Sequence, residues 1–279
     1  MSKLIVTHSS PDFDGIPAIW LFKKFHPDFA DARVAFTPAG TTYNNMVVDS
    51  DPDIVHVDTG LGRFDHHQSD AFTCGAQLVY EWLVKEGYIS AEDKALARII
   101  KVITELDHAY DAYKWPEPAS DRWEFNLHNV LTGWKMMYGR EDDKYMDLTI
   151  QGLEAVYRLM QQKVKAEAEV EKGEKFKTKW GEGIAIYTPN DSVLDAAIKG
   201  GYAVVVRKDP GKGYIRVTGS NAHDVDLTKA YEDFMKADPQ ATWFLHASKK
   251  LLRNGSTRNP TMKPTKLELA EVIKILEKA

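Results

Sequence analysis

Short apolar runs that end in polar residues are the feature that most restricts the fold of this chain. Residues 3–7 (KLIVT) and 53–59 (DIVHVDT) are rich in β-branched side chains, and a third such run, ARVAFTP, lies at 32–38. Compact runs of this kind are typical of buried strands in a parallel sheet, where both faces of each strand are covered.

Helical patterns alternate with these runs. Apolar residues recur at helical spacing in 15–22, 75–86 and 91–106, and Ser90 fits the N-cap of the last segment. Strands that alternate with helices predict an α/β fold with a doubly wound parallel sheet.

The second half of the chain has a different texture. A helical pattern over 145–172 ends in a charge-dense stretch, and alternating or β-branched runs follow at 183–188, 202–208 and 214–220. DPGKG at 209–213 predicts a hairpin turn, and 225–236 and 266–278 are helical in pattern. We therefore expect an N-terminal α/β domain at 1–145, a helical linker at 146–180 and a smaller α+β domain at 181–279, joined by a long helix.

Composition excludes several classes of protein. The 279 residues carry a net charge of −5, so the chain as a whole is not a cation that coats nucleic acid. One cysteine, Cys74, rules out an intrachain disulfide and a cysteine-based zinc site. No segment has the length of a signal peptide's apolar core or of a membrane span, which favours a cytoplasmic protein without a membrane partner.

Histidine and aspartate residues gather where the predicted strands and one helix end. They are His8, Asp12, Asp14, Asp58, the Asp65-His66-His67 run and Asp107. Ligands of open parallel sheets bind at the carboxyl ends of the strands, so these side chains are expected to meet there. Carboxylate and imidazole groups suit Mn²⁺ or Mg²⁺, and Asp58, central among the segments, is the candidate to bridge two ions.

The motifs HSSPDFDG, VDTG, DHH and ELD, in this order, resemble the four motifs of the DHH phosphoesterase superfamily. That superfamily includes RecJ-like exonucleases and family II inorganic pyrophosphatases. The resemblance covers residues 8–107, and it is weaker in the second domain, where the usual Gly-Gly-Gly-His sequence is absent.

The resemblance implies two ions, Mn²⁺ or Mg²⁺, per chain. His8, Asp12 and Asp58 would hold one ion, and the other would be held by Asp14, Asp58, His66 and Asp107. Asp65 would orient a histidine, and His67 would face the attacked phosphate, so that Asp58 and His67 are the predicted catalytic residues.

A basic stretch in the second domain is the predicted substrate side. From His246 onward it has no acidic residue through Lys266 and carries the cations Lys249, Lys250, Arg253, Arg258, Lys263 and Lys266. A helix followed by a solvated loop would explain the pattern, and so would a phosphate clamp formed by Arg253-Asn254-Gly255. The resemblance adds His246 to this clamp, and Arg63, beside the DHH run, is a further candidate to meet a phosphate.

These residues together predict a metal-dependent phosphoesterase that hydrolyses a phosphodiester or phosphoanhydride of a nucleotide-like substrate through a water activated by two ions. The alternative is a catalytically silent nucleotide- or phosphate-binding protein of the same fold. The expected partner is a phosphate-containing small molecule or a short single-stranded nucleic acid, and a homodimer is possible. Trp115, Trp123 and Trp134 are either platforms for bases or core residues.

Overall fold

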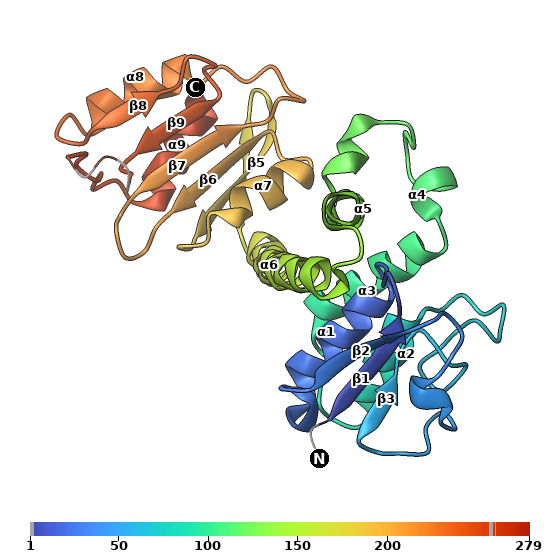
Figure 1. The fold of residues 1–279 in the computed structure, drawn as a ribbon. Helices are drawn as coiled ribbons and strands as arrows, with labels where there is room; N and C mark the ends of the chain where they lie inside the picture. Colours follow the sequence, from blue (N-terminus) through green and yellow to red (C-terminus); the bar gives the residue numbers. More distant parts are fainter. Residues whose placement is uncertain (1–2, 257–258, 260) are drawn as a thin grey trace. The chain divides into compact units, whose positions relative to one another are not determined.

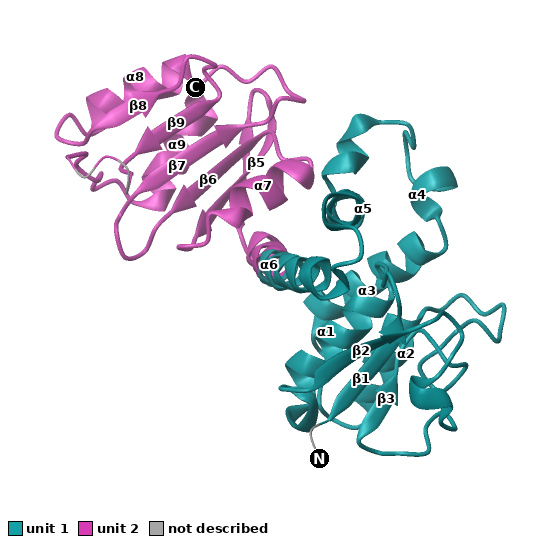
Figure 2. Ribbon diagram, in the orientation of Figure 1, with its two compact units in different colours: residues 1–161 teal, residues 162–279 magenta. Residues whose placement is uncertain are grey.

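The chain forms two compact units joined within one helix. The computed structural model describes residues 3–256, 259 and 261–279 (Figure 1). The units are residues 1–161 and 162–279 (Figure 2), and their boundary lies inside α6 (Asp142–Glu171). The predicted fold class, an α/β part and a smaller α+β part joined by a long helix, is therefore confirmed.

A parallel sheet forms the base of unit 1. Its strands are β1 (Leu4–His8), β2 (Arg33–Thr37) and β3 (Ile54–His56), in the order β2-β1-β3. Leu4 is in register with Arg33 on one side and with Ile54 on the other. β3 is shorter than the pattern suggested, because the chain turns at Asp58, which has a φ of +51°. This turn brings Asp58 to the carboxyl edge of the sheet.

Three helices complete the core of unit 1. α1 (Gly15–Phe25) packs against α2 (Gly75–Lys85), and α2 packs against α3 (Lys94–Asp107). Their buried side chains are mainly aliphatic and aromatic, and include Ile16, Ile19, Trp20, Phe22, Val79, Leu83, Leu96 and Ile103. The prediction that Ser90 caps α3 was wrong, since the Asp93 side chain accepts the N–H of Leu96 at 2.9 Å and fixes the helix start there.

Unit 1 also contains shorter helices that the sequence pattern did not specify. They are η1 (Pro27–Phe29), η2 (Tyr43–Asn45), α4 (Tyr110–Tyr113), η3 (Asp121–Phe125) and α5 (Leu127–Tyr138). The first part of α6 belongs to this unit, where Tyr145 and Leu153 are buried and Glu154 accepts the indole N–H of Trp20 at 2.7 Å. Within the described residues, no helix combines the length and apolar character needed to cross a lipid bilayer.

Unit 2 is built on a mixed sheet in the order β4-β5-β6-β7-β9-β8. The strands are β4 (Glu174–Thr178), β5 (Gly181–Tyr187), β6 (Val204–Lys208), β7 (Ile215–Gly219), β8 (Trp243–Leu245) and β9 (Leu251–Asn254). β5 and β6 are parallel, and the other neighbours are antiparallel. The helical reading of the stretch after Trp243 was wrong: it forms the β8–β9 hairpin, and its apolar residues alternate into the core.

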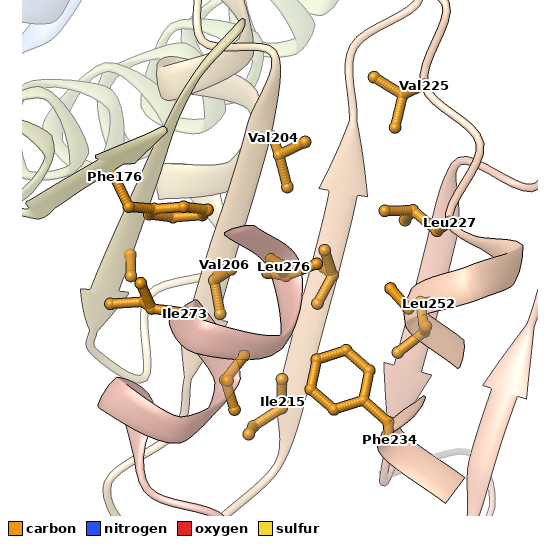
Figure 3. Close-up of a cluster of buried hydrophobic side chains, with 14 of the residues drawn as sticks. Phe176, Val204, Val206, Ile215, Val225, Leu227, Phe234, Leu252, Ile273 and Leu276 are labelled. Carbon is orange, nitrogen blue, oxygen red and sulfur yellow. The ribbon is translucent and has the colours of Figure 1, made fainter. Parts of the chain in front are cut away.

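Helices cover the two faces of this sheet unequally. α8 (Thr228–Ala237) and α9 (Leu269–Lys278) enclose one face with a large apolar cluster that includes Phe176, Val204, Val206, Ile215, Phe234 and Leu252 (Figure 3). On the other face, α7 (Ser192–Lys199) packs on β6 in a smaller cluster around Val205. On the same face, Leu194 and Ile198 of α7 line a pocket with Thr218 of β7 and Leu251 of β9.

Candidate metal centre

The loop after β1 carries the first two acidic candidates. One oxygen of Asp12, Oδ1, accepts the N–H groups of Asp14 and Gly15 at 2.9 and 3.2 Å and so caps the start of α1. The other, Oδ2, lies 3.7 Å from Nε2 of His8. Asp12 therefore holds the start of α1 through one oxygen and leaves the other facing His8, where a ligand would be expected.

Two helices hold the same loop in place. Ser10 has a φ of +55°, and its N–H donates to Asp142 Oδ2 at 3.0 Å, while its carbonyl accepts from Lys135 Nζ at 2.9 Å. Asp142 begins α6 and Lys135 lies on α5. The loop that carries Asp12 is thus fixed by residues that lie 132 and 125 positions beyond Ser10 in the chain.

Asp14 joins the first motif to α2. Its two oxygens accept the N–H groups of Gly75 and Ala76 at 2.7 Å each, at the N-terminus of that helix. Gly75 allows this approach, since a Cβ there would lie 3.0 Å from Asp14 Oδ2 and 3.1 Å from the Phe64 carbonyl oxygen. The helix N-terminus stabilises the carboxylate charge.

Asp58 occupies the middle of the cluster. Its side chain is only 2% exposed, and its two oxygens face different groups. Oδ2 lies 3.2 Å from His8 Nε2, whereas Oδ1 lies 3.7 Å from His66 Nε2 and 3.8 Å from His67 Nδ1. Oδ1 is buried, and none of the described residues forms a hydrogen bond with it. A bound cation would supply the partner that this buried oxygen lacks.

The two histidines of the DHH run have different surroundings. His66 Nε2 lies 3.7 Å from Asp14 Oδ2 and 3.8 Å from Asp107 Oδ2 at the end of α3. His67 instead places Nδ1 2.7 Å from Oδ1 of the buried Asp65, whose Oδ2 accepts the N–H of Leu61. The His67 side chain is 59% exposed. Asp65 is thus positioned to fix the orientation of His67 and to leave its Nε2 available.

Burial and mutual repulsion perturb the ionisation of these groups. Burial raises the pKa of Asp14 and of Asp58 to about 7 each, and it also raises the pKa of Asp107. The hydrogen bond to Asp58 raises the pKa of His8 to about 9, and the one to Asp65 raises the pKa of His67. A set of buried carboxylates with raised pKa values is poorly stabilised without positive charge nearby.

The donor atoms fall into three overlapping groups in which all ligand atoms lie within 4.8 Å of one another. These groups are His8–Asp12–Asp58, Asp14–His66–Asp107 and Asp58–His66–His67. Oxygen and imidazole donors suit Mn²⁺ and Mg²⁺, and the cation would satisfy Oδ1 of Asp58. The residues present therefore fit one or more divalent ions.

A pocket of about 360 Å³ opens at the metal centre. Its lining combines the predicted residues His8, Asp12, Asp58, Asp65 and His67 with Ala39, Gly40 and Leu61. The last three were missed from the sequence, although Ala39 and Gly40 follow β2 at the same sheet edge as the ligands.

Arg63 does not line this pocket. Its guanidinium lies 4.6 Å from the ring centroid of Phe64 and 5.3 Å from that of Trp82, and Nε is 3.6 Å from Asp49. These contacts direct the charge toward the aromatic rings and Asp49, and a role of Arg63 toward a phosphate stays a prediction.

The residues of the predicted phosphate clamp in unit 2 differ in burial, and two of them are inside the fold. Asn254 is 0% exposed; its amide donates to the carbonyls of Thr242 and Lys263, and its oxygen accepts the N–H of Thr265. Gly255 has a φ of +82°, and a Cβ there would lie 1.9 Å from the Tyr214 ring. Both residues therefore shape the fold, which corrects their assignment to the substrate.

The remaining residues of the clamp are on the surface. His246 is exposed, with Nδ1 2.9 Å from Ser248 Oγ, and Arg253 is partly buried on β9. Arg258 lies outside the described residues.

The three candidate tryptophans do not share one site. The ring centroids of Trp115 and Trp123 lie 5.3 Å apart, and both rings line an apolar pocket of about 450 Å³ with Phe13. Trp134 is not part of that lining.

Comparisons with known proteins find similarity at the level of structure. No protein-family model and no curated protein matches the sequence. A solved DHH-domain structure, described as a member of a family of ribosomal proteins, is 13% identical over 99% of this chain and 86% of its own, with a TM-score of 0.34. RecJ of Thermus thermophilus in complex with Mg²⁺ is 14% identical over 99% of this chain and 49% of its own, with a TM-score of 0.33.

The first of these structures is described as a DHH domain, and the second is a RecJ protein. Since the TM-scores lie below 0.5, activity and substrate have to be inferred from the geometry of the site itself.

Proposed function

We propose that this chain is a metal-dependent phosphoesterase that hydrolyses a phosphodiester or phosphoanhydride bond in a nucleotide-like substrate. The observation that carries the proposal is the orientation of Asp58. Its two oxygens face separate sets of imidazole and carboxylate donors from one buried position. That is the arrangement expected of a carboxylate shared by two cations.

The chain offers a donor set for each of two ions. His8 and Asp12 would share one ion with Asp58, and Asp14, His66 and Asp107 would share the other with it. Two bound Mn²⁺ or Mg²⁺ ions would supply charge stabilisation for a phosphoryl group and would lower the pKa of a water molecule.

His67 is the residue we place against the substrate. Its Nδ1 is taken by Asp65, so Nε2 is the nitrogen free to meet an oxygen of the reacting phosphate. The raised pKa keeps a larger fraction of the imidazole protonated near neutral pH. A protonated Nε2 can donate to a phosphoryl oxygen and hold the substrate in line for attack.

The completeness of the donor set supports an enzyme over the silent binding protein. Each predicted ligand position is a histidine or an aspartate, and the carboxylates keep a buried cluster that costs stability without cations. A protein that only binds phosphate has no need to bury carboxylates at this cost in stability.

A substrate panel tests the proposal. Purified protein with Mn²⁺ is offered pyrophosphate, a dinucleotide, short RNA and short DNA, and the products are separated by chromatography. We expect hydrolysis of at least one phosphodiester or phosphoanhydride, abolished by EDTA and restored by excess Mn²⁺.

Asp58→Asn and Asp31→Asn are the matched variants for this assay. Both remove one carboxylate from unit 1, but Asp31 is exposed on the surface. Asp58→Asn should lose activity by several orders of magnitude and Asp31→Asn should keep it. Equal activity of the two variants, or no hydrolysis of any phosphate ester by the wild type, would contradict the proposal.

A further inference from the structure

Ser10 lies midway between two donors of the metal centre. His8 precedes it by two residues and Asp12 follows it by two, and both belong to the donor group that they form with Asp58. We call this the first donor group. His8 and Asp12 belong to neither of the other two groups, so the backbone at Ser10 controls the spacing of the two donors that only the first group contains.

The backbone conformation of Ser10 depends on support from other parts of the chain. Its φ of +55° lies in the left-handed region, which residues other than glycine rarely adopt. Such a residue persists only where the surrounding structure fixes it. Ser10 is exposed, so packing around its side chain does not supply this support.

Two charged side chains hold the two polar groups of the Ser10 backbone. Asp142 Oδ2 accepts the Ser10 N–H at 3.0 Å, and Lys135 Nζ donates to the Ser10 carbonyl oxygen at 2.9 Å. Hydrogen bonds with one charged partner are roughly twice as strong as neutral ones. Since the residue is held on both sides, its φ cannot relax without breaking one of these bonds.

The peptide that joins Ser9 to Ser10 also orients His8. Its carbonyl oxygen lies 2.9 Å from His8 Nδ1, and its N–H is the one that Asp142 accepts. Because a peptide unit is planar, fixing the N–H also fixes the direction of the carbonyl. A ligand histidine is usually oriented by such a bond at its second ring nitrogen. The bond leaves Nε2 of His8 facing Asp58 at 3.2 Å.

Buried Tyr145 fixes the orientation of Asp142. Its hydroxyl donates to Asp142 Oδ1 at 2.6 Å, so one oxygen of this carboxylate is bound to Tyr145 and the other to Ser10. Lys135 Nζ lies 5.7 Å from the centroid of the same Tyr145 ring. One buried side chain thus contacts both of the residues that hold Ser10.

Close packing of α5 on α6 keeps the two charges together. Lys135 lies on α5, and Asp142 begins α6. Gly152 of α6 permits a close approach, since a Cβ at this position would lie 2.6 Å from Cδ1 of Leu127 at the start of α5. The two helices therefore act as one support for the loop.

Asp14, the third acidic or imidazole donor of the loop, has a separate support. Its oxygens accept the N–H groups of Gly75 and Ala76 of α2 at 2.7 Å each. These bonds involve neither α5 nor α6. Loss of the contacts at Ser10 would therefore release Asp12 and the His8 ring, while Asp14 would stay bound to α2.

We propose that Asp142 and Lys135 are positioning residues for one ion only, the ion of the first donor group. They act through the Ser10 backbone, which places the His8 ring and the loop that carries Asp12. The ion of the group that contains Asp14 does not depend on them. The inference rests on the part of the proposed function that assigns two divalent ions to this site, and not on hydrolysis.

Mn²⁺ binding to the full chain measures the effect on each ion. Calorimetric titration of the metal-free protein gives the two affinities. Electron paramagnetic resonance distinguishes an isolated Mn²⁺ ion, with its sharp hyperfine pattern, from a magnetically coupled pair. Both measurements are independent of turnover.

Asp142→Ala removes the acceptor of the Ser10 N–H. One Mn²⁺ ion should bind at least about tenfold more weakly, since a charged hydrogen bond is lost, and the other should bind within about twofold of the wild type. The signal of isolated Mn²⁺ should persist to higher metal concentrations. Asp142→Asn keeps an oxygen that can accept the N–H and should recover most of the affinity.

Asp143→Ala is the matched control for Asp142→Ala. Asp143 is exposed in the same first turn of α6, so its removal changes the charge at the helix N-terminus without a loss of contact to Ser10. This variant should bind both ions like the wild type. Circular dichroism checks that each variant is folded, and the ion whose affinity is unchanged provides an internal control for an intact centre.

Lys135→Met separates position from charge. Removing a cation two residues from Asp12 along the held loop would strengthen Mn²⁺ binding if charge alone mattered. Loss of the bond to the Ser10 carbonyl should instead weaken the ion of the first donor group at least about threefold. Lys85→Met removes an exposed lysine at the end of α2 and is the control.

Three results would each overturn the inference. They are unchanged affinities in Asp142→Ala, equal weakening of both ions in that variant, and tighter Mn²⁺ binding by Lys135→Met. An Asp142→Asn variant as weak as Asp142→Ala would likewise assign the effect to charge and not to position.

The same titrations distinguish this inference from the proposed function. If the variants behave as expected but the wild type hydrolyses no phosphate ester, the phosphoesterase is refuted and the positioning role stands. If the wild type is active and both of its ions respond equally to Asp142→Ala, only the positioning role is refuted. A wild type that binds no Mn²⁺ would refute both.

Discussion

Replacing Asp58 by asparagine should stabilise the metal-free protein while it abolishes the response to metal. At pH 8 the wild-type carboxylate is ionised, and its pKa of about 7 lies roughly three units above the ordinary value of 3.8. At 1.36 kcal/mol per unit, keeping this charge buried costs about 4 kcal/mol.

Asparagine avoids this cost but loses the contact with His8. Because Asp58 raises the pKa of His8 to about 9, the pair still contributes at pH 8, and its loss offsets part of the gain. We expect Asp58→Asn to be about 1–3 kcal/mol more stable than the wild type in EDTA at pH 8.

The sign of the pH dependence follows from the direction of the shift. A carboxyl group whose pKa is raised on folding contributes stability below its unfolded pKa, and that contribution is lost as pH rises through the folded value. Asp58 and Asp14 should therefore weaken the metal-free wild type between about pH 4 and pH 7. The loss should be smaller in Asp58→Asn, which cannot ionise at this position.

Metal binding should make the wild type the more stable of the two proteins. An ion at one hundred times its Kd stabilises the folded state by about 2.7 kcal/mol per site, and Asp58→Asn should gain far less because the proposed sites of both ions include Asp58. Urea unfolding followed by tryptophan fluorescence, with EDTA and with Mn²⁺, measures both effects, and Asp31→Asn is the control. The reasoning fails if Asp58→Asn is less stable than the wild type in EDTA and gains as much from Mn²⁺.

Three further variants test individual residues. His67→Ala should lower kcat by about 10²–10⁴-fold while metal content by elemental analysis stays near that of the wild type, since the other two donor groups lack His67; a loss of metal would make it a ligand instead. Gly75→Ala should weaken Mn²⁺ binding in calorimetric titration, because the added Cβ would press on Asp14 and the Phe64 carbonyl; unchanged affinity would contradict the tight packing. Asn254→Ala should lower the free energy of unfolding by about 2–4 kcal/mol through the loss of its buried hydrogen bonds, with Mn²⁺ affinity unchanged. An unchanged free energy of unfolding would contradict the structural role of Asn254.

The grouping of the candidate ligands could be predicted from the sequence because their positions follow from the strand ends. A parallel sheet collects the carboxyl ends of β1 and β3 at one edge, so His8 and Asp58 had to meet once those runs were read as strands. The order of the motifs supplied the remaining donors. Local hydrophobic patterns were sufficient here, since each ligand lies within a few residues of a strand or helix end.

Tertiary structure alone decided how the side chains are oriented. The sequence did not show that Asp58 directs its two oxygens to different donors, that Asp65 holds His67, or that Arg63 turns toward aromatic rings. These outcomes depend on the backbone turn at Asp58 and on the packing of α1 and α2, which are set by contacts between distant segments.

Three arginines of unit 2 show most clearly what the sequence alone does not determine. Arg207, Arg216 and Arg253 become neighbours only because β9 pairs with β7, and in one particular register. A shift of one residue in that register would send Arg253 into the core and Leu252 to the surface. The sequence thus determined which residues carry charge, and strand pairing determined which of them become neighbours, because pairing depends on the total burial of the sheet and not on any local pattern.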